Sequence, residues 1–245
     1  MIDKLDINEY IKLYNNGYPL DRMKPVQTQT DKIFRLSKVD IRVVERSMVY
    51  SNPEAYKKLA HFIQYNQYFY MVPITTVRGT IVGFIVRGIF EKGYNTILRS
   101  FSSLEVQVPL MYGFDESFKK YDTYPKCCPI VVCEGCKDVM TLKKIYPYVL
   151  SNNRSSMGTN IKVLRNISDK FLLAYDNDEA GKKGMDKDKK TLRGMGAYVD
   201  TLVLPEGVKD CTDYLIPPVT GKVSKDNFDK LKQQVKSKLI KLYNI

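Results

Sequence analysis

Hydrophobic positions in the first 70 residues recur at intervals of three and four, as in amphipathic helices. The segments YIKLYNNGY and EAYKKLAHFIQYNQYFY show this spacing most clearly. From Met71 the pattern changes to two short runs rich in β-branched residues, MVPITTV and TIVGFIV, with Arg78-Gly79 between them. Such runs around a glycine-containing turn predict a β-hairpin. The chain should therefore begin with a mixed α+β lobe, in which helices pack with antiparallel strands.

After Pro129 short apolar runs alternate with helical stretches. The runs PIVVC, YVLS, KFLLAY and AYVDTLVLP predict strands, and KDVMTLKKIY and EAGKKGMDKDKKTLRGMG predict helices between them. This alternation favours an α/β fold with a mainly parallel sheet flanked by helices. The segment YDTYPKCCP reads as a linker, and the last residues predict a lysine-rich amphipathic helix. We therefore expect three parts, with boundaries at 1–126, 127–221 and 222–245.

Charge and composition narrow the function. The chain of 245 residues carries 39 Lys and Arg against 27 Asp and Glu, a net charge of +12, which favours a polyanionic partner such as nucleic acid. A solvated lysine surface is an equally ordinary origin of such a charge. The single histidine, His61, argues against histidine-based catalysis. The short apolar runs predict no membrane partner, and five cysteines without an export signal predict a cytoplasmic location.

Acidic residues follow three of the predicted strands. Glu134 follows PIVVC, Asp176 and Asp178 follow KFLLAY, and Asp210 and Asp213 come after TLVLP. The carboxyl ends of parallel strands meet at one edge of a sheet, so these side chains should converge there. Converging carboxylates repel one another, and Mg²⁺ or Mn²⁺ relieves that repulsion. Turns and helix caps also favour Asp, so capping remains an alternative for some of them.

Cys133 and Cys136 have the spacing of half a zinc site. A complete structural site needs two further ligands, and the remaining cysteines are Cys127, Cys128 and Cys211. Two of these are adjacent, which is a poor second pair. Cys133 also lies within a strand that should be buried, where a thiol packs as a small apolar group. We therefore expect no structural zinc.

The acidic segments resemble a known family. EGCKD, DNDEAG and KDCTDYL, which begin at Glu134, Asp176 and Lys209, resemble the Toprim motifs of bacterial and phage DnaG-like primases. Upstream, VPITTVRGTIVGFIVRG is similar to the hairpin of the primase N-terminal lobe, and LMYGF and SMGT are similar to further primase segments. The resemblance extends from about Met71 to Leu215, and it implies a Toprim catalytic domain preceded by an N-terminal primase lobe.

The resemblance also implies roles for the acidic residues. Glu134, Asp176 and Asp178 would be catalytic. The metal ligands would be Glu134, Asp176, Asp178 and Asp210. Asp138 and Asp213 would be additional acidic residues near the metal. KDCTDYL departs from the family by placing Cys211-Thr212 after Asp210, which weakens the match at Asp213.

Basic residues complete the implied site. Arg87 matches a family residue that lines the groove for template and nucleotide. The family places lysines before the Leu-Tyr-Gly segment, where this chain has VQV at 106–108, and Arg99 or Lys92 would supply the missing charge. The implied reaction is the synthesis of short RNA primers from NTPs on single-stranded DNA with Mg²⁺ or Mn²⁺. A replicative helicase and a separate zinc-binding protein would be partners, and the host cytoplasm would be the location if a phage encodes the chain.

Two other functions use the same residues. A Toprim-family nuclease or topoisomerase-like enzyme would use the acidic cluster to cleave DNA phosphodiesters. A non-catalytic nucleic-acid-binding module would retain the cluster without using it. Repelling carboxylates have no reason to stay together in a disused site, which argues against the last alternative.

Overall fold

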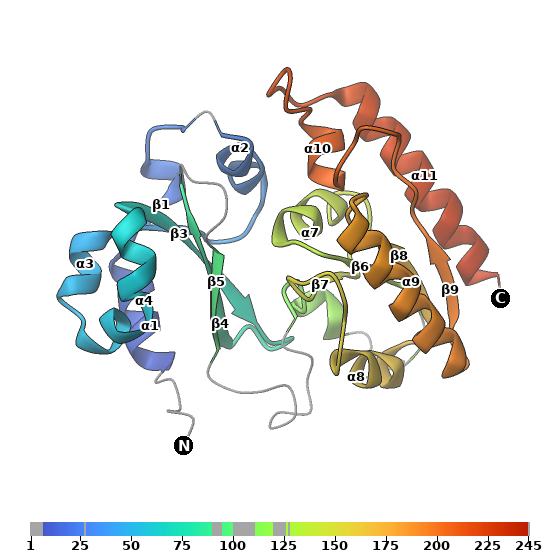
Figure 1. Cartoon of the computed structure of the whole chain (residues 1–245), viewed down its shortest axis with the longest axis horizontal. Coiled ribbons are helices and arrows are strands. Elements are labelled where there is room, and N and C mark those ends of the chain that lie inside the picture. Colours follow the sequence, from blue (N-terminus) through green and yellow to red (C-terminus); the bar gives the residue numbers. More distant parts are fainter. Residues whose placement is uncertain are drawn as a thin grey trace.

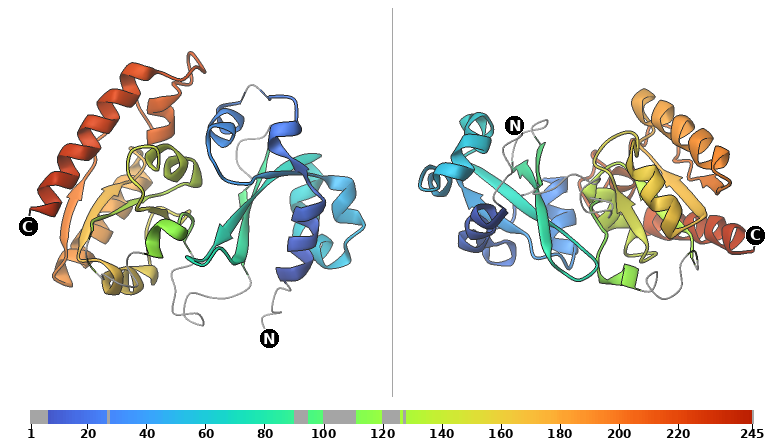
Figure 2. Two further views of the ribbon diagram at one scale, coloured as in Figure 1. Left: turned by 180° about the vertical axis from the view of Figure 1, so that it is seen from behind. Right: turned by 90° about the horizontal axis from the view of Figure 1, so that it is seen from below.

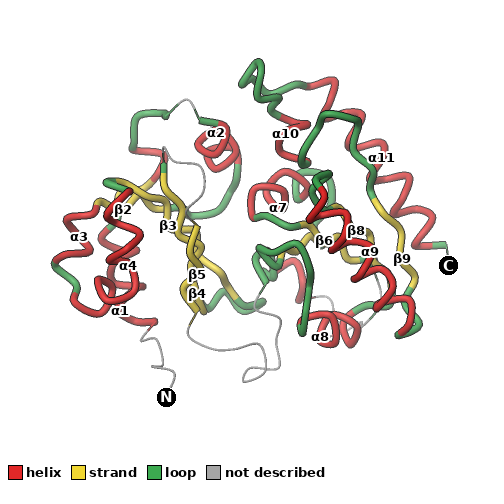
Figure 3. Tube along the Cα trace, viewed as in Figure 1, coloured by secondary structure: helices red, strands yellow, loops and turns green. Residues whose placement is uncertain are grey.

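A computed structural model of the chain describes residues 7–26, 28–89, 95–99, 111–119, 126 and 128–244; at 95–97, 99 and 116 only the backbone is described. Two sheets lie side by side, each with helices around it (Figure 1). Helices and strands alternate more regularly in the C-terminal half, as Figure 3 shows. Within the described residues, every helix is too short or too polar to span a membrane.

The N-terminal sheet is antiparallel, with the strand order β1-β2-β3-β4-β5. The predicted hairpin is confirmed: its strands pair from Phe69 opposite Gly88 to Thr75 opposite Ile81, and Gly79 supplies the positive φ of the turn. The strands are β1 (Tyr18–Pro19), β2 (Arg42–Glu45), β3 (Tyr68–Thr75), β4 (Ile81–Gly88) and β5 (Asn95–Arg99). The mostly helical interpretation of residues 1–70 missed β1 and β2, which are too short to show a clear period of two.

Three of the helices cover the outer face of this sheet, whereas α2 (Gln29–Leu36) and the second half of the molecule lie against its inner face (Figures 1 and 2). Phe69 and Met71 of β3 point outward into a core with the helices, whereas Tyr70 and Val72 point inward. The helices of this half are α1 (Ile7–Asn16), α2 (Gln29–Leu36), α3 (Arg46–Tyr50), α4 (Pro53–Tyr65) and the 3-10 turn η1 (Leu20–Arg22).

The C-terminal sheet is parallel throughout, as predicted, with the order β7-β6-β8-β9. Val131 and Leu172 face α7, α10 and α11, while Val132 and Leu173 face α8 and α9. The strands are β6 (Ile130–Cys133), β7 (Val149–Ser151), β8 (Lys170–Ala174) and β9 (Tyr198–Thr201). The helices are α7 (Cys136–Leu142), α8 (Asn160–Ile167), α9 (Glu179–Gly194), α10 (Cys211–Leu215) and α11 (Lys225–Tyr243), with η2 (Glu116–Lys119) before the sheet.

One hydrophobic core joins the two halves. The cluster that contains Tyr70 and Val72 of the antiparallel sheet also contains Val131 and Leu172 of the parallel sheet. The buried face of the predicted C-terminal amphipathic helix belongs to the same cluster, through Leu231, Val235, Leu239 and Leu242. The sheets are therefore held together by side-chain packing as well as by the chain that connects them.

A buried aspartate fixes the turn that contains SMGT. Asp188 of α9 is 2% exposed and accepts hydrogen bonds from Ser156 Oγ (2.8 Å), Met157 N (2.7 Å) and Tyr175 Oη (2.6 Å). One turn earlier on α9, Gly184 lies so close to this loop that an added Cβ would meet a loop carbonyl oxygen at 1.6 Å. The loop that follows β7 is therefore anchored on α9 at two points.

Candidate active site

Three carboxylates converge beyond the carboxyl ends of the parallel strands. Asp138 lies in the first turn of α7, which follows β6; Asp176 follows β8; and Asp210 caps α10, which follows β9. One carboxylate oxygen from each of the three lies within 4.8 Å of the others. Asp138 and Asp210 are buried, at 3% and 7% exposure. The order of the predicted strands placed Asp176 and Asp210 at the same edge, whereas Asp138 was named only through the family resemblance; the structure brings the three into a single group.

Hydrogen bonds between the motifs fix the orientation of this group. Asp138 Oδ1 accepts from Thr212 N (3.0 Å) and Thr212 Oγ1 (2.9 Å). Asp210 Oδ1 accepts from Asp213 N (2.6 Å) at the start of α10. The third acidic segment is thus tied directly to the first, and Thr212, where the family match departs, is the residue that makes the tie.

Glu134 lies beside the group, and Asp178 has a structural contact of its own. Glu134 Oε1 accepts a hydrogen bond from Asp176 N (3.1 Å). Asp178 is the N-cap of α9 and accepts from Gly181 N (2.9 Å), with its side chain 46% exposed. An added Cβ at Gly181 would lie 2.5 Å from Glu134 Oε1, so the glycine lets α9 approach the glutamate. Helix capping therefore accounts for one contact of Asp178, while Glu134 adjoins the three-carboxylate group.

Burial and mutual repulsion disfavour the charged forms of these groups. Burial, together with the charge of Asp176, raises the pKa of Glu134 to about 7. Burial and the charge of Asp210 raise the pKa of Asp176 to about 6, although Lys209 Nζ lies 3.4 Å from its Oδ2. The pKa of Asp138 rises well above its usual value because it is fully buried next to Asp210 and Asp176. An all-oxygen group under such repulsion fits a hard divalent cation, Mg²⁺ or Mn²⁺.

The carboxylates form one wall of a cavity of about 360 Å³ between the two sheets, and basic side chains form much of the rest. Arg87, which the sequence singled out, reaches the cavity from β4 of the antiparallel sheet. Sequence reasoning missed Lys137, Arg154 and Lys209, which also line it. Lys137 and Lys209 are adjacent in sequence to Asp138 and Asp210, and this adjacency could have indicated that they line the site. Arg154 lies after β7, in the loop that is anchored on α9, and no acidic motif adjoins it in the sequence.

The other two predicted basic residues are not placed in this cavity. Lys92 lies outside the described residues. Arg99 is the last residue of β5, and its backbone pairs with Gly83. The structure describes only the backbone of this residue. Both assignments therefore stay predictions.

Asp213 takes part in a bridge between the two halves of the molecule. Its Oδ1 accepts from Gln29 Nε2 (2.7 Å), and Gln29 Oε1 accepts from Lys137 Nζ (3.0 Å). Gln29 begins α2 of the N-terminal half. Asp213 therefore connects α10 to α2 and α7, and it lies outside the group of three carboxylates.

The cysteines near the site are buried thiols. Burial raises the pKa of Cys136 to about 11, and it raises the pKa values of Cys133 and Cys211 well above the usual value. The thiol of Cys133 donates to the carbonyl oxygen of Leu150 at 3.5 Å. In the described part of the chain, the group of metal-ligand type consists of the three aspartates, without a cysteine. Cys127 lies outside the described residues.

Comparison with protein families identifies the half of the chain that carries the carboxylates. Residues 131–215 match the family model described as Toprim-like. This segment is a Toprim-like domain. It includes β6 to β9 together with every acidic residue singled out above, so the family match and the converging carboxylates fall on the same part of the fold.

Solved primase structures share the fold of both halves, the antiparallel lobe as well as the Toprim-like domain. The Aquifex aeolicus primase, with zinc binding and RNA polymerase domains, has a TM-score of 0.61 and 17% identity over 94% of this chain and 59% of its own. A DnaG primase catalytic domain bound to single-stranded DNA has a TM-score of 0.60 and 19% identity over 94% and 79%. The primase fragment of the bacteriophage T7 primase-helicase protein has a TM-score of 0.54 and 17% identity over 90% and 80%.

The chain has the fold of a DnaG primase catalytic core. It spans 59% of the Aquifex chain, so it corresponds to part of that protein. A search of curated protein sequences gives no match. At 16–19% identity among the structures, the likeness rests on the arrangement of the elements rather than on sequence.

Proposed function

We propose that this chain is a primase catalytic core, which joins ribonucleotides into short RNA primers on a single-stranded DNA template. The observation that carries the proposal is the group formed by Asp138, Asp176 and Asp210, which faces Arg87 across a cavity between the two sheets of a primase fold. Acidic and basic side chains that line one cavity suit a reaction in which a cation and phosphates must be held together.

Asp138, Asp176 and Asp210 would hold the divalent cation, with Glu134 next to them. Their oxygen atoms are close enough to share an ion. Burial first, and then their mutual repulsion, raises the pKa values of Asp138 and Asp176, and a bound cation would relieve the repulsion. A bound Mg²⁺ would supply stabilisation of negative charge on the attacking and leaving oxygens of a phosphoryl transfer. Asp178, at the N-cap of α9, would act from the margin of this group.

The basic residues would bind and orient phosphates. Lys137, Arg154 and Lys209 belong to the Toprim-like domain, and Arg87 belongs to the other sheet, so phosphates in the cavity would contact both halves. Arginine can pair with two phosphate oxygens at once, which fixes orientation. Glu134 has a pKa of about 7, so its carboxylate could accept the proton of an attacking 3′-hydroxyl near neutral pH.

The partners in the proposal follow from the same fold. The single-stranded DNA bound to the DnaG catalytic domain supports a DNA template for this chain. The zinc binding domain of the Aquifex primase and the helicase part of the T7 protein support two partners for it, a zinc-binding module and a replicative helicase. A phage origin and a location in the host cytoplasm remain part of this proposal.

A nuclease that uses the same acidic group is the second candidate. The five-stranded antiparallel sheet favours the primase, because the structural likeness to primases extends over this half as well as over the Toprim-like domain. A nuclease would need the acidic group but would have no use for a second lobe with the primase arrangement.

Primer synthesis tests the proposal. The purified chain is incubated with mixed-sequence single-stranded DNA, radiolabelled NTPs and Mg²⁺ or Mn²⁺, with and without a zinc-binding primase module and a helicase. Glu134→Gln and Asp176→Asn should abolish the short RNA products, whereas Asp186→Asn, an exposed site on α9, should keep them. Metal-dependent cutting of the DNA without any RNA product would refute the primase and support the nuclease.

A further inference from the structure

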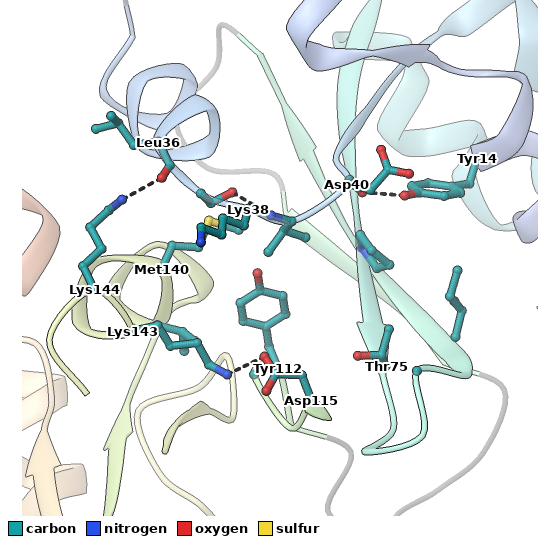
Figure 4. Close-up of a pocket in the computed structure, with 17 residues that line it drawn as sticks. Tyr14, Leu36, Lys38, Asp40, Thr75, Tyr112, Asp115, Met140, Lys143 and Lys144 are labelled. Atoms are coloured by element: carbon teal, nitrogen blue, oxygen red, sulfur yellow. Dashed lines mark hydrogen bonds and ion pairs between the residues drawn. The ribbon is translucent and has the colours of Figure 1, made fainter. Parts of the chain in front are cut away.

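A second and larger cavity lies between the two halves, away from the carboxylates. Its volume is about 740 Å³, which lies within the range of small-molecule sites. Five segments line it: Tyr14 of α1, residues 36–40 before β2, β3 and β4 near their turn, residues 112–115, and the second half of α7 with the two lysines after it (Figure 4). The acidic residues of the candidate active site are not among its walls.

Tyr112 places an unpartnered hydroxyl in this cavity. The residue is 4% exposed, and its ring stands among the lining side chains with the hydroxyl pointing into the open space (Figure 4). Burial raises the pKa of Tyr112 well above its usual value, so the O–H stays protonated. Among the described residues nothing forms a hydrogen bond with this hydroxyl, although buried tyrosines usually have a partner. A polar atom of a bound molecule would satisfy it.

Two lysines leave positive charge at the cavity. Both acidic residues in its wall already have cationic partners: Asp115 pairs with Lys143, and Asp40 pairs with Arg42 at 3.0 Å. Lys38 and Lys144 have no such carboxylate partner among the described residues; Lys144 Nζ donates to the Leu36 carbonyl oxygen at 2.6 Å.

The two ammonium groups also act on each other. Burial, and after it the charge of Lys38, lowers the pKa of Lys144. An anion between the two lysines would relieve this repulsion, so the charge of the cavity favours a negatively charged ligand.

The rest of the wall is largely apolar. It is built from aliphatic side chains and a proline of both halves, which would contact the non-polar part of a ligand. These are Leu36, Val39, Pro73, Ile81, Val139 and Met140.

We propose that this cavity binds a small amphipathic anion, whose apolar body contacts the aliphatic wall, whose acidic group lies at Lys38 and Lys144, and whose polar atom pairs with the Tyr112 hydroxyl. This site is separate from the proposed catalytic function. α7 lies between the two: Asp138 in its first turn belongs to the group of three carboxylates, and Val139 and Met140, with Lys143 and Lys144 after the helix, border the second cavity.

Two fluorescent probes that differ in charge test the proposal. 1-Anilinonaphthalene-8-sulfonate is anionic, and N-phenyl-1-naphthylamine is its neutral counterpart. The full chain should bind one molecule of the sulfonate at least about tenfold more tightly than the neutral dye, since hydrogen bonds to charged groups are strong. Lys38→Gln with Lys144→Gln should remove this preference. Tyr112→Phe, which keeps the ring in the core, should weaken sulfonate binding about threefold or more.

Matched variants separate this site from the catalytic cavity. Lys183→Gln, at an exposed lysine of α9, and Lys137→Gln, in the carboxylate cavity, should leave sulfonate binding unchanged. Equal affinity for the two dyes, binding that survives the Lys38, Lys144 and Tyr112 changes, or binding that Lys137→Gln abolishes would each overturn the proposal.

Competition then distinguishes the sources of such an anion. Displacement of the sulfonate by decanoate assigns the site to aliphatic acids, and displacement by adenosine monophosphate assigns it to nucleotides. Failure of both at millimolar concentration would overturn the proposal. Because none of these readouts depends on primer synthesis, the result stands apart from that of the function assay.

Discussion

Neutralising Asp176 should make the metal-free protein more stable while it removes the response to metal. The Asp176 side chain is 15% exposed and lies within 4.8 Å of two other carboxylates. Its pKa is raised from 3.8 to about 6 in the folded chain, first by burial and then by Asp210. A raised carboxyl pKa means that the ionised form destabilises the fold, so stability falls as the pH rises through about 6.

The size of the effect follows from the pKa. The rise in the pKa of Asp176 from 3.8 to about 6 corresponds to a loss of at most about 3 kcal/mol in the free energy of unfolding at pH 8. Asp176→Asn also removes the attraction of Lys209, and the neighbouring carboxyls adjust their own protonation, so roughly 1–3 kcal/mol should remain. For a chain of this length, this gain raises the melting temperature by roughly 3–9 °C.

Thermal unfolding measures this at pH 8 in EDTA and again with Mg²⁺. Mg²⁺ should stabilise the parent chain markedly and Asp176→Asn much less, so the gap between them should shrink or reverse. The gain in EDTA should also fade as the pH drops towards 4, where the parent side chain is protonated as well. Asp186→Asn, an exposed control on the following helix, should show neither effect.

The reasoning fails if Asp176→Asn melts below the parent chain in EDTA at pH 8. That result would mean that Asp176 stabilises the fold as a charged group, through Lys209 or another contact. The three carboxylates would then be an ordinary ion-pair network, and the electrostatic argument for a metal site would be lost.

Three further predictions concern the fold and the basic cavity. Gly184→Ala should lower the free energy of unfolding, measured in urea, by about 2–3 kcal/mol, because the added Cβ would overlap a loop carbonyl. Gly194 on the same helix has open space around it, so Gly194→Ala should raise the free energy of unfolding by up to about 1 kcal/mol. Burial alone would raise the pKa of Asp200, but the hydrogen bonds from Lys238 and Thr201 N, together with the charges of Lys238 and Lys241, outweigh burial and leave the pKa lowered. Lys238→Gln should therefore cost about 0.5–1 kcal/mol at pH 7, a loss that disappears as the pH falls below about 4. Arg87→Gln should weaken binding to oligo(dT) and reduce the slope of log affinity against log salt by about 0.7, as expected for one lost phosphate contact to a single strand.

The elements with a long or regular pattern could be predicted from the sequence. The hairpin around Gly79 has two eight-residue strands and a clear turn residue, and the parallel strands are apolar runs that alternate with helical segments; both are confirmed. β1 and β2 have two and four residues, so neither produces a periodic signal, and their pairing is set by contacts with β3. The order of parallel strands alone predicts which edge of the sheet carries the acidic residues.

The composition of the acidic group could not be read from the sequence. Asp138 belongs to it because α7 starts directly after Glu134-Gly135 and Thr212 holds its carboxylate. Asp178, with the more obvious motif position, caps α9 instead of joining the three. The conformation of the loops, over a few ångströms, decides which carboxylates lie together. The hydrophobic period and the spacing of motifs along the sequence carry no information at that scale. The metal-binding roles themselves remain predictions.

The core that both sheets share bears on how such a chain can be divided. Val131 and Leu172 pack in the same cluster as Tyr70 and Val72, and Gln29 of α2 adds a polar link to Lys137. A Toprim-like fragment cut out at residue 127 would expose part of this cluster to water, which favours aggregation. The two lobes are therefore one packing unit, and the segment recognised by its motifs is smaller than that unit.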